Sequence, residues 1–532
     1  MDCTPQHLPY EQTGYFSKII IDYLKGDEEL GPFYAHPVSL EGIKAAIEER
    51  KIYRTDRKLL VARLKQQYEG MTFQENVAAN IERLNTENTF TVATAHQPNI
   101  FTGHLYFVYK ILHAVKLAAK LKEQLPQFNF VPVFYMGSED ADLDELGHIY
   151  LFGEKYEWKT RQTGAVGRMK VDKELIQLIA SISGQLLVLP HGAEIIDLIK
   201  DCYHEGDTIE KATFKFIHAL FGEYGLVVLL PDDAVLKNSF IPIVEKELTS
   251  SFSYKAVEET ATAFPKTYKV QAGGREINLF YLLDDSRERI EGQHSTFNIQ
   301  HSTLVFDRAS IIEELHQHPE RFSPNVILRP VYQEMILPNI AFIGGGGEIA
   351  YWLELKKVFA EVGVPFPILV LRNSFLIVEK SYGLRVKDLG FVVSDLFKDE
   401  NLLMNTLVKR DSDVQLSLEK EKAMLKDLYE QIKKISGSVD TTLQKHTEAL
   451  QAKALKKIEA LEKKMLKAEK KKFEAQQRQL QKLRAQLFPN NGLQERIENL
   501  LPFYAKWGKD FIKMVYEHSL ALEQQFVLLE EK

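Results

Sequence analysis

Five carboxylates crowd into one short segment of the chain. Ser138–Glu145 reads SEDADLDE and follows the apolar run Phe130–Met136 directly. Carboxylates so close together repel one another unless they meet a cation, so the segment indicates a site for an ammonium group or for Mg²⁺, with the identity of any metal left open. The alternative is a loop of solvated acids, because exposed charge needs no partner. The candidate catalytic residues of this segment are Glu139, Asp140 and Asp142.

A second group of candidates lies in Ala95–Tyr106, AHQPNIFTGHLY, where an expected strand meets an expected helix. The backbone amides and dipole of a helix N-terminus favour an anion. We therefore expect Thr102, Gly103 and His104 to bind phosphate oxygens. The segment contains neither a dinucleotide fingerprint nor a P-loop. A tight turn with a capping threonine is the alternative interpretation.

Two further segments carry polar residues beside apolar runs. In Ser323–Tyr351, four glycines allow close approach of the backbone to a ligand, and Glu348 follows them at the start of an expected helix. That acid would either bind a polar substrate with Arg329 and Gln333 or only complement the helix dipole. The second segment, Arg372-Asn373-Ser374, follows the apolar run Pro367–Leu371. Its Arg372 is either a clamp for a carboxylate or phosphate or one partner of an interdomain ion pair. The glycines, assigned to nucleotide binding, are Gly344, Gly345, Gly346 and Gly347.

The elements that must position these residues alternate between strand and helix. Thr89–Thr94 and Phe130–Met136 have strand composition, and the apolar segment Leu105–Leu121 between them predicts a helix. This alternation is typical of a βαβ unit with a parallel sheet. The fold class is thus α/β, a doubly wound core interrupted by insertions, with ligands at the carboxyl ends of its strands. Further strands are expected at Leu226–Leu230, Asn325–Leu328 and Pro367–Leu371.

Changes in composition along the chain predict its domain boundaries. From about Asp411 the sequence becomes rich in Lys, Glu, Gln and Leu, which indicates long helices. The expected parts are an N-terminal helical part at 1–88, the first part of the core at 89–144, an insertion at 145–225, a core strand at 226–232, a second insertion at 233–320, the second part of the core at 321–400, a coiled coil at 411–488 and a C-terminal helical segment at 489–532 that returns to the core.

The coiled coil is expected to contain a discontinuity. Ser436–Ser438 should separate two helices, the second running from about Thr441 to Leu487. Its apolar residues follow a heptad spacing that shifts by one residue between Ala468 and Phe473. Lys and Arg outnumber Asp and Glu by twelve to four between Gln451 and Leu487. These lysines are either the solvated flank of a coiled coil or a surface for RNA.

Composition excludes several classes of protein. With Lys+Arg 67 against Asp+Glu 74, the 532-residue chain has a net charge of −7, which argues against general nucleic-acid affinity. Two cysteines exclude a disulfide framework and a CxxC metal site. The chain has no apolar stretch of membrane-spanning length and no signal-peptide pattern at its start, so we expect a cytoplasmic protein without a membrane partner.

Taken in order, these segments resemble the BshC family, which adds cysteine in bacillithiol biosynthesis. The segment His96–Tyr106 followed by Tyr109-Lys110 is similar to the first family motif, and Ser138–Leu146 is similar to the second. Two positions depart from the pattern: His104 replaces a proline, and Ala141 replaces a histidine. The match extends through Arg329-Pro330, Gln333, Leu337-Pro338, Gly344–Glu348, Tyr351, Arg372-Asn373-Ser374 and Leu493–Arg496.

The resemblance implies a Rossmann-type core of the nucleotidyltransferase-like kind, with insertions similar to those of class I aminoacyl-tRNA synthetases and a coiled-coil homodimer. It also implies a ligase that joins the carboxyl group of cysteine to the amine of glucosaminyl-malate. Because a free carboxylate resists attack by an amine, we expect ATP, with Mg²⁺, to activate it as an acyl-adenylate or an acyl-phosphate.

Site residues carried over from the resemblance complete the hypothesis. Since the usual histidine is Ala141 here, His96 and His104 are the candidates to replace it, and the identity of the base is left open. The alternatives from the residues alone are an RNA-associated synthetase-like protein and a non-catalytic coiled-coil scaffold. The expected substrate-binding residues are Gln97, Tyr106, Arg329, Gln333, Glu348, Tyr351, Arg372, Asn373 and Ser374.

Overall fold

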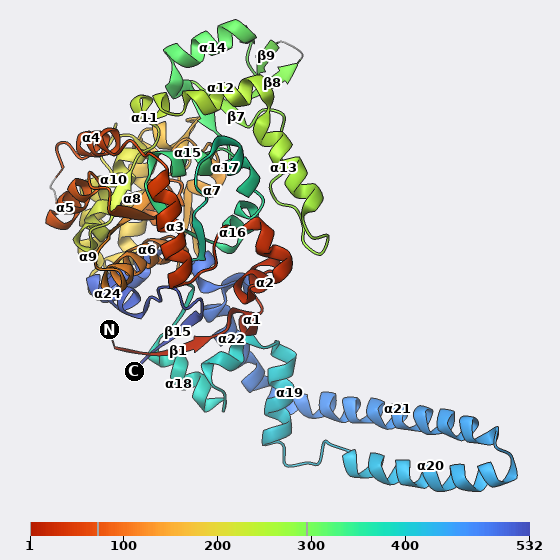
Figure 1. Ribbon diagram of the computed structural model, residues 1–532. Coiled ribbons are helices and arrows are strands. Elements are labelled where there is room, and N and C mark those ends of the chain that lie inside the picture. The colour runs from red at the N-terminus through yellow and green to blue at the C-terminus, as the bar shows by residue number, and fades with distance from the viewer. Residues whose placement is uncertain (1, 72–73, 294–295) are drawn as a thin grey trace. The chain divides into compact units, whose positions relative to one another are not determined.

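The computed structural model describes residues 2–71, 74–293 and 296–532 (Figure 1). The chain forms two compact units, one of Met1–Leu376 with Gly492–Leu529 and one of Ile377–Asn491 with Glu530–Lys532. No helix among the described residues is both long enough and apolar enough to span a bilayer.

A five-stranded parallel sheet forms the core of the first unit. Its spatial order is β13-β12-β2-β3-β6, and every neighbouring pair is parallel. Starting from β2, the chain adds β3 and β6 on one side and then returns to add β12 and β13 on the other. The order therefore reverses between β2 and β12, the point at which doubly wound sheets open a crevice for ligands. The strands are β2 (Thr89–His96), β3 (Asn129–Met136), β6 (Val227–Leu229), β12 (Asn339–Gly344) and β13 (Ile368–Leu371).

Four of the five expected strands are confirmed, and the fifth is wrong. Asn325–Leu328 is a turn that leads into helix α15 (Arg329–Ile336), with Leu328 as its N-cap and Pro330 in the first turn. Proline favours the first turn of a helix, and a short apolar run alone does not distinguish strand from helix. A strand not expected from the sequence is β12, whose sequence NIAFIG ends at Gly344, the first of the four glycines.

Helices cover the sheet and bury its apolar residues. The expected helix after β2 is α6 (Leu105–Gln124), which packs against β2 and β3, while α3 (Leu40–Ile52) packs against β12 and β13. Side chains of α3, α6 and the strands share one core cluster, which includes Ile47, Leu117 and Val92. The other elements before β2 are β1 (Cys3–Leu8), α1 (Tyr10–Thr13), α2 (Lys18–Lys25), α4 (Arg57–Gln67) and α5 (Glu75–Arg83).

The two segments expected as insertions both lie within the first unit. Between β3 and β6 the chain forms α7 (Leu143–Leu146), β4 (His148–Leu151), β5 (Glu154–Glu157), α8 (Lys173–Leu186), α9 (Gly192–Cys202) and α10 (Ile209–Phe221). After β6, an antiparallel sheet of order β10-β9-β8-β7-β11 is the main feature. Its segment contains α11 (Ala234–Asn238), α12 (Ile241–Ser250), α13 (Phe252–Ala263), β7 (Leu279–Leu282), β8 (Arg287–Gln293), β9 (Thr296–Ile299), β10 (Val305–Asp307), α14 (Arg308–Gln317) and β11 (Phe322–Pro324).

Residues Gly492–Leu529 of the C-terminal segment belong to the same unit as the parallel sheet. Phe511, Ile512 and Val515 of this segment are buried, and β1 lies next to β15 in a small sheet. The remaining elements of the second half of this unit are α16 (Gly346–Trp352), α17 (Lys356–Val362), α23 (Leu500–Trp507) and α24 (Lys509–His518). Strands β14 (Phe375–Val378) and β15 (Phe526–Glu531) each cross the boundary of the unit.

The second unit contains a long helical hairpin. Helices α20 (Glu419–Val439) and α21 (Leu443–Lys470) lie side by side, linked by Lys433–Glu448 and Lys422–Glu462 ion pairs (Figure 1). Ser436–Ser438 is still helical, so the break comes a few residues later than expected. The shift in the heptad pattern coincides with a 3₁₀ turn at Lys471–Phe473. The other helices are α18 (Lys380–Asp388), α19 (Glu400–Asp411) and α22 (Glu474–Leu487).

A buried ion pair joins α3 to the segment that carries β12. Arg50 donates to the Glu334 carboxylate at 2.8 Å and to the Asn339 carbonyl at 2.8 Å, and the side chains are 1% and 0% exposed. Removing one partner of a buried pair costs about 3–5 kcal/mol. We expect Arg50→Met to lower the free energy of unfolding of this unit by that amount.

Tryptophan fluorescence during urea denaturation measures the Arg50 effect, because Trp158, Trp352 and Trp507 all lie in the first unit. Arg54→Met is the matched control, since Arg54 is exposed. Equal transitions for the two variants would contradict the role given to the pair.

Candidate functional site

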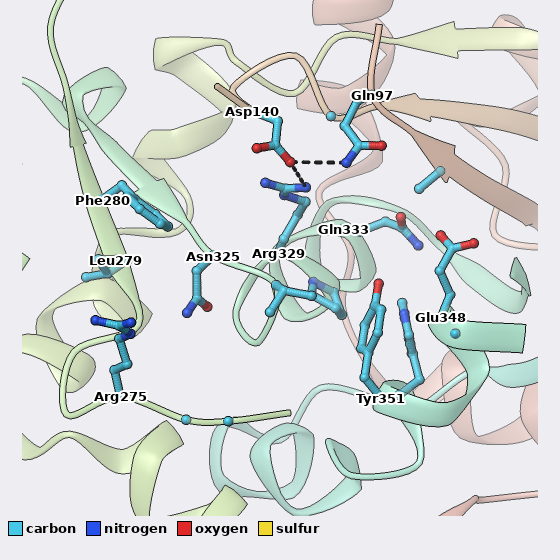
Figure 2. Close-up of a pocket in the computed structure, with 18 of the residues that line it drawn as sticks. Gln97, Asp140, Arg275, Leu279, Phe280, Asn325, Arg329, Gln333, Glu348 and Tyr351 are labelled. Atoms are coloured by element: carbon cyan, nitrogen blue, oxygen red, sulfur yellow. Dashed lines mark hydrogen bonds and ion pairs between the residues drawn. The ribbon is translucent and has the colours of Figure 1, made fainter. Parts of the chain in front are cut away.

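A cavity of about 1370 Å³ lies at the carboxyl ends of the central strands. His96 ends β2, and Gly345 follows β12, so the cavity sits where the strand order reverses. Figure 2 shows its two walls: Arg275 and Phe280 come from the second insertion, and Glu348 and Tyr351 come from α16 on the opposite side. The expected site residues that line it are His96, Gln97, Tyr106, Asp140, Arg329, Gln333, Gly345, Gly346, Gly347, Glu348, Tyr351 and Arg372.

Arg329 reaches the cavity from the first turn of α15. Its Nη1 lies 3.6 Å from Asp140 Oδ2, the oxygen that also accepts a 3.1 Å hydrogen bond from the Gln97 amide (Figure 2). Burial alone would raise the pKa of Asp140, but Arg329 and Arg287 outweigh burial and hold that pKa below its usual value. The buried Nε of Arg329 has no hydrogen-bond partner among the described residues. This guanidinium can therefore accept an additional anionic ligand.

Glu348 occupies the N-terminus of α16. Its Oε2 accepts hydrogen bonds from the Gly345 amide at 2.7 Å and from Lys110 Nζ at 2.6 Å. Burial lowers the pKa of Lys110, although Glu348 acts against that shift. Because a carboxylate already complements this helix end, a phosphate there would meet like charge. Gly344 does not line the cavity among the described residues, and a Cβ at that position would lie 2.8 Å from the Phe342 ring.

Arg372 borders the cavity but is held by the protein itself. Its Nη2 donates to Glu495 at 2.7 Å, its Nη1 donates to the Asn373 carbonyl at 3.0 Å and to Ser374 Oγ at 3.1 Å, and its guanidinium lies 5.1 Å from the Tyr106 ring centroid. Arg372 therefore forms an ion pair, but its partner belongs to the same unit, so the expectation of an interdomain pair is wrong. Asn373 and Ser374 are buried and are not among the described lining residues, so they position Arg372 instead of meeting a ligand.

The two candidate histidines differ in position. His96 lines the cavity with its Nε2 3.2 Å from the Tyr106 hydroxyl, whereas His104 is not among the described lining residues and lies 3.2 Å from the Ile497 carbonyl. Burial, with Lys110 nearby, lowers the pKa of His96 to about 3. An imidazole with that pKa stays neutral near pH 7 and is a weak proton acceptor.

The turn before α6 does not provide the expected phosphate site. Thr102 is buried, and neither it nor Gly103 is among the described residues that line the cavity. The Leu105 amide donates to the Glu498 carbonyl at 2.8 Å, and the Asn499 side chain donates to Phe101 O at 2.9 Å. The C-terminal segment therefore satisfies this helix end. The N-cap is His104, without a side-chain capping bond, so the capping-threonine interpretation is also wrong.

The acidic segment does not converge on one point. Glu139 is buried in an ion pair with Lys237 at 2.5 Å, and Lys237 also contacts Asp232 at 2.9 Å. Asp142 caps α7 through the Glu145 amide at 3.1 Å. Only Asp140 of the three expected residues lines the cavity. Among the described residues, no three His, Cys, Asp or Glu side chains gather in a way that could hold a metal ion.

Several lining residues were not among the site residues expected from the sequence. Arg287 and Arg289 come from β8, Arg275 precedes β7, and Arg496 follows Glu495 in the C-terminal segment. Arginines at i and i+2 on a strand share a face, which is the one sequence signal that could have identified Arg287 and Arg289. Glu145 also lines the cavity, and burial, followed by Asp142 and Asp140, raises the pKa of its carboxyl group.

Cationic side chains outnumber anionic ones around the cavity. Among the described lining residues, seven are Lys or Arg and five are Asp or Glu, an excess that favours anionic ligands. The cations are Lys255, Arg275, Arg287, Arg289, Arg329, Arg372 and Arg496, and the anions are Asp140, Glu145, Glu276, Glu291 and Glu348.

Comparison with known proteins identifies relatives over nearly the full chain. A relative from Flavobacterium johnsoniae is 38% identical over 524 residues, covering 98% of this chain and 99% of that protein. One from Cytophaga hutchinsonii is 40% identical over 491 residues, covering 92% of each. Both carry the name "Putative cysteine ligase BshC". A solved structure titled as a putative arginyl-tRNA synthetase from Campylobacter jejuni is 12% identical, covering 83% of this chain and 96% of that one, but its TM-score of 0.23 does not establish a common fold.

Two family models match this chain in succession. The model for "Bacillithiol biosynthesis BshC, N-terminal Rossmann-like domain" matches residues 1–373. The model for "Bacillithiol biosynthesis BshC, C-terminal coiled-coil domain" matches residues 375–531. These matches confirm the resemblance and the expected fold class, a Rossmann-like core followed by a coiled coil. The chain belongs to the BshC family of bacillithiol biosynthesis.

Proposed function

We propose that this ligase joins the carboxyl group of cysteine to the amine of glucosaminyl-malate, with ATP activating the carboxyl group. The observation that carries the proposal is the cation-rich cavity at the reversal of the strand order. Malate and cysteine both present carboxylates, which guanidinium groups bind through paired hydrogen bonds. The names of the relatives support the cysteine assignment.

Arg329 and Gln333 are the residues we assign to the malate carboxylates. Both come from α15 and line the cavity, and Figure 2 shows them between its two walls. Asp140 contacts the Arg329 guanidinium and accepts a hydrogen bond from Gln97, so these two residues together fix the position of Arg329. Holding both substrates in one cavity would supply much of the rate enhancement, because it replaces an encounter in solution with an oriented one.

ATP fits the cavity in size and in charge. A volume of about 1370 Å³ exceeds the roughly 300–1,000 Å³ of a typical ligand pocket, so it has room for more than one reactant. ATP would supply a better leaving group on the cysteine carboxyl carbon than the carboxylate itself offers. We assign no ligand residues to Mg²⁺, which would accompany the phosphates of the nucleotide.

Glu145 is the residue we propose as proton acceptor for the attacking amine. It lines the cavity beside Asp140, and its raised pKa brings its titration closer to neutral pH than that of an ordinary glutamate. A general base works best when its pKa lies near the working pH. The low pKa of His96 makes that histidine the weaker candidate.

Incubating the protein with cysteine, glucosaminyl-malate, ATP and Mg²⁺ should yield the amide-linked thiol, detected by its mass. Arg329→Ala should raise KM for glucosaminyl-malate by about 10–100-fold, because it removes a charge-assisted contact with the carboxylates. Arg161→Ala, at an exposed arginine outside the cavity, is the matched control. Absence of product from the wild type, under conditions in which a relative is active, would contradict the ligase assignment.

Glu145→Gln should lower kcat/KM by about 10²–10⁴-fold at neutral pH, since the general base is lost. In the wild type the carboxylate accepts the proton, so the rate should fall as pH drops through the raised pKa of Glu145. This decrease in rate at low pH should be absent from the pH–rate profile of Glu145→Gln, which should show only the decrease caused by protonation of the substrate amine. Asp144→Asn, at an exposed neighbour, should keep the wild-type profile. If the pH–rate profile of Glu145→Gln matches that of the wild type at low pH, a different residue is the general base.

We further propose that the hairpin of α20 and α21 pairs with the hairpin of a second copy. Exposed apolar residues on α20 recur at intervals of four, four, three and four, which places them on one face of the helix. Pairing with α21 leaves this stripe uncovered among the described residues, and a second hairpin offers the same stripe in return. Its members are Met424, Leu428, Ile432, Ile435 and Val439.

Light scattering after gel filtration should give the wild type twice the mass of one chain. The double variant Ile435→Glu with Val439→Glu should elute as a monomer, because it places charges within the stripe that the second copy would bury. Ala423→Glu adds a charge at an exposed position on another face of the same helix and should remain dimeric. A dimeric double variant would show that this stripe is not the interface.

A further inference from the structure

Two arginines and a phenylalanine form one surface of the cavity. Arg287 and Arg289 lie two residues apart on β8, so their side chains share a face, and Arg289 pairs in register with Phe280 of β7. The guanidinium carbon lies 3.7 Å from the Phe280 ring centroid for Arg287 and 5.8 Å for Arg289. All three residues line the cavity. The ring thus holds two guanidinium groups close together at the ligand space.

Positive charge at this surface exceeds the negative charge around it. The carboxylate of Asp140 lies 3.8 Å from Arg287 and 3.6 Å from Arg329, so one anion serves two cations. Among the described residues, no carboxylate lies within 4 Å of the guanidinium of Arg289 or of Arg275. Burial, followed by the charge of Arg329, lowers the pKa of Arg287 to about 10. An added anion would relieve this repulsion.

The helix ends that the sequence suggested for phosphate are already satisfied. The Glu498 carbonyl accepts the Leu105 amide at the start of α6, and Glu348 accepts the Gly345 amide at the start of α16. Both helix ends would therefore stabilise a bound anion less than an exposed helix end would. Figure 2 places Phe280 and Arg275 on the wall opposite Glu348 and Tyr351, away from the residues of α16. The cavity is also larger than one ligand needs.

We propose that Arg287 and Arg289, supported by Phe280, bind the phosphate groups of the nucleotide. This inference deepens the proposed function and rests on it, since the nucleotide is the activating substrate of that reaction. Two adjacent guanidinium groups can each form paired hydrogen bonds to phosphate oxygens, a geometry that lysine cannot reproduce. The core wall, with Arg329 and Gln333, then remains for the carboxylate substrate.

Titration calorimetry with tripolyphosphate, ATP and malate as separate probes tests this subsite without turnover. The wild type should bind tripolyphosphate and ATP, with an affinity that falls as salt rises. Arg289→Ala should raise the Kd for both by at least about tenfold and leave malate binding unchanged. The Kd of Arg289→Lys for both probes should lie between those of the wild type and Arg289→Ala, because lysine keeps the charge but cannot form the paired hydrogen bonds. Arg161→Ala is the matched control and should bind all probes like the wild type.

Folding of Arg289→Ala is checked by far-UV circular dichroism, and we expect the native spectrum because this arginine has no ion-pair partner among the described residues. Equal tripolyphosphate affinity in the wild type and in Arg289→Ala, or no binding to the wild type, overturns the subsite. A loss confined to malate also overturns it and assigns these arginines to carboxylates.

Failure of the subsite and failure of the ligase assignment give different results. Product formation by the wild type, with unchanged ATP affinity in Arg289→Ala, overturns the phosphate subsite and leaves the ligase function intact. Weakened tripolyphosphate binding in Arg289→Ala, with no ligation product from the wild type, supports the subsite while the ligase assignment fails.

Discussion

Parallel pairing brings the carboxyl ends of β2, β3 and β12 to the same edge of one sheet, and every other feature of the site depends on that constraint. The order of the strands reverses between β2 and β12, so the segments that follow them separate and leave space. His96, Asp140 and Gly345 enter the cavity for this reason, although they are far apart in the sequence. The insertion that carries β7 and β8 then closes the opposite side (Figure 2).

Competition among the protein's own charges decides which cations remain for a ligand. Glu495 binds Arg372, and Glu348 binds Lys110, so these two cations serve mainly to order the loops around the cavity. Arg329 and Arg287 share the single carboxylate of Asp140. Cations that are incompletely neutralised in this way are the ones best able to bind an incoming anion.

The C-terminal segment completes the first unit after the chain has left it to form the hairpin. Glu495 fixes Arg372, the Glu498 carbonyl satisfies the start of α6, and Asn499 orders the turn before it. These contacts join residues separated by more than 100 positions. They explain why the motif Leu493–Arg496 resembles the family pattern although it lies beyond the coiled coil: its role is to hold the edge of the site in place.

Local sequence determined the elements of this protein well. Four strands of the parallel sheet, helix α6 and the shift in the heptad repeat follow from residue composition and periodicity, because β-branched runs and apolar spacing act over a few residues. Five residues of the quoted family motifs, Gln97, Asp140, Arg329, Gln333 and Glu348, line one cavity, whereas Thr102, Gly103 and Glu139 of the same motifs are not among its described lining residues.

Only the tertiary structure decided which of the polar residues reach the cavity. Glu139 and Asp140 are neighbours in sequence, yet Lys237 buries one in an ion pair and Arg329 draws the other to the ligand space. Arg287 and Arg289 belong to an insertion without a local motif, and they gain their position from the pairing of β7 with β8. Sequence fixes the direction of a side chain relative to its own strand or helix, but a buried charge takes its partner from segments that are distant along the chain.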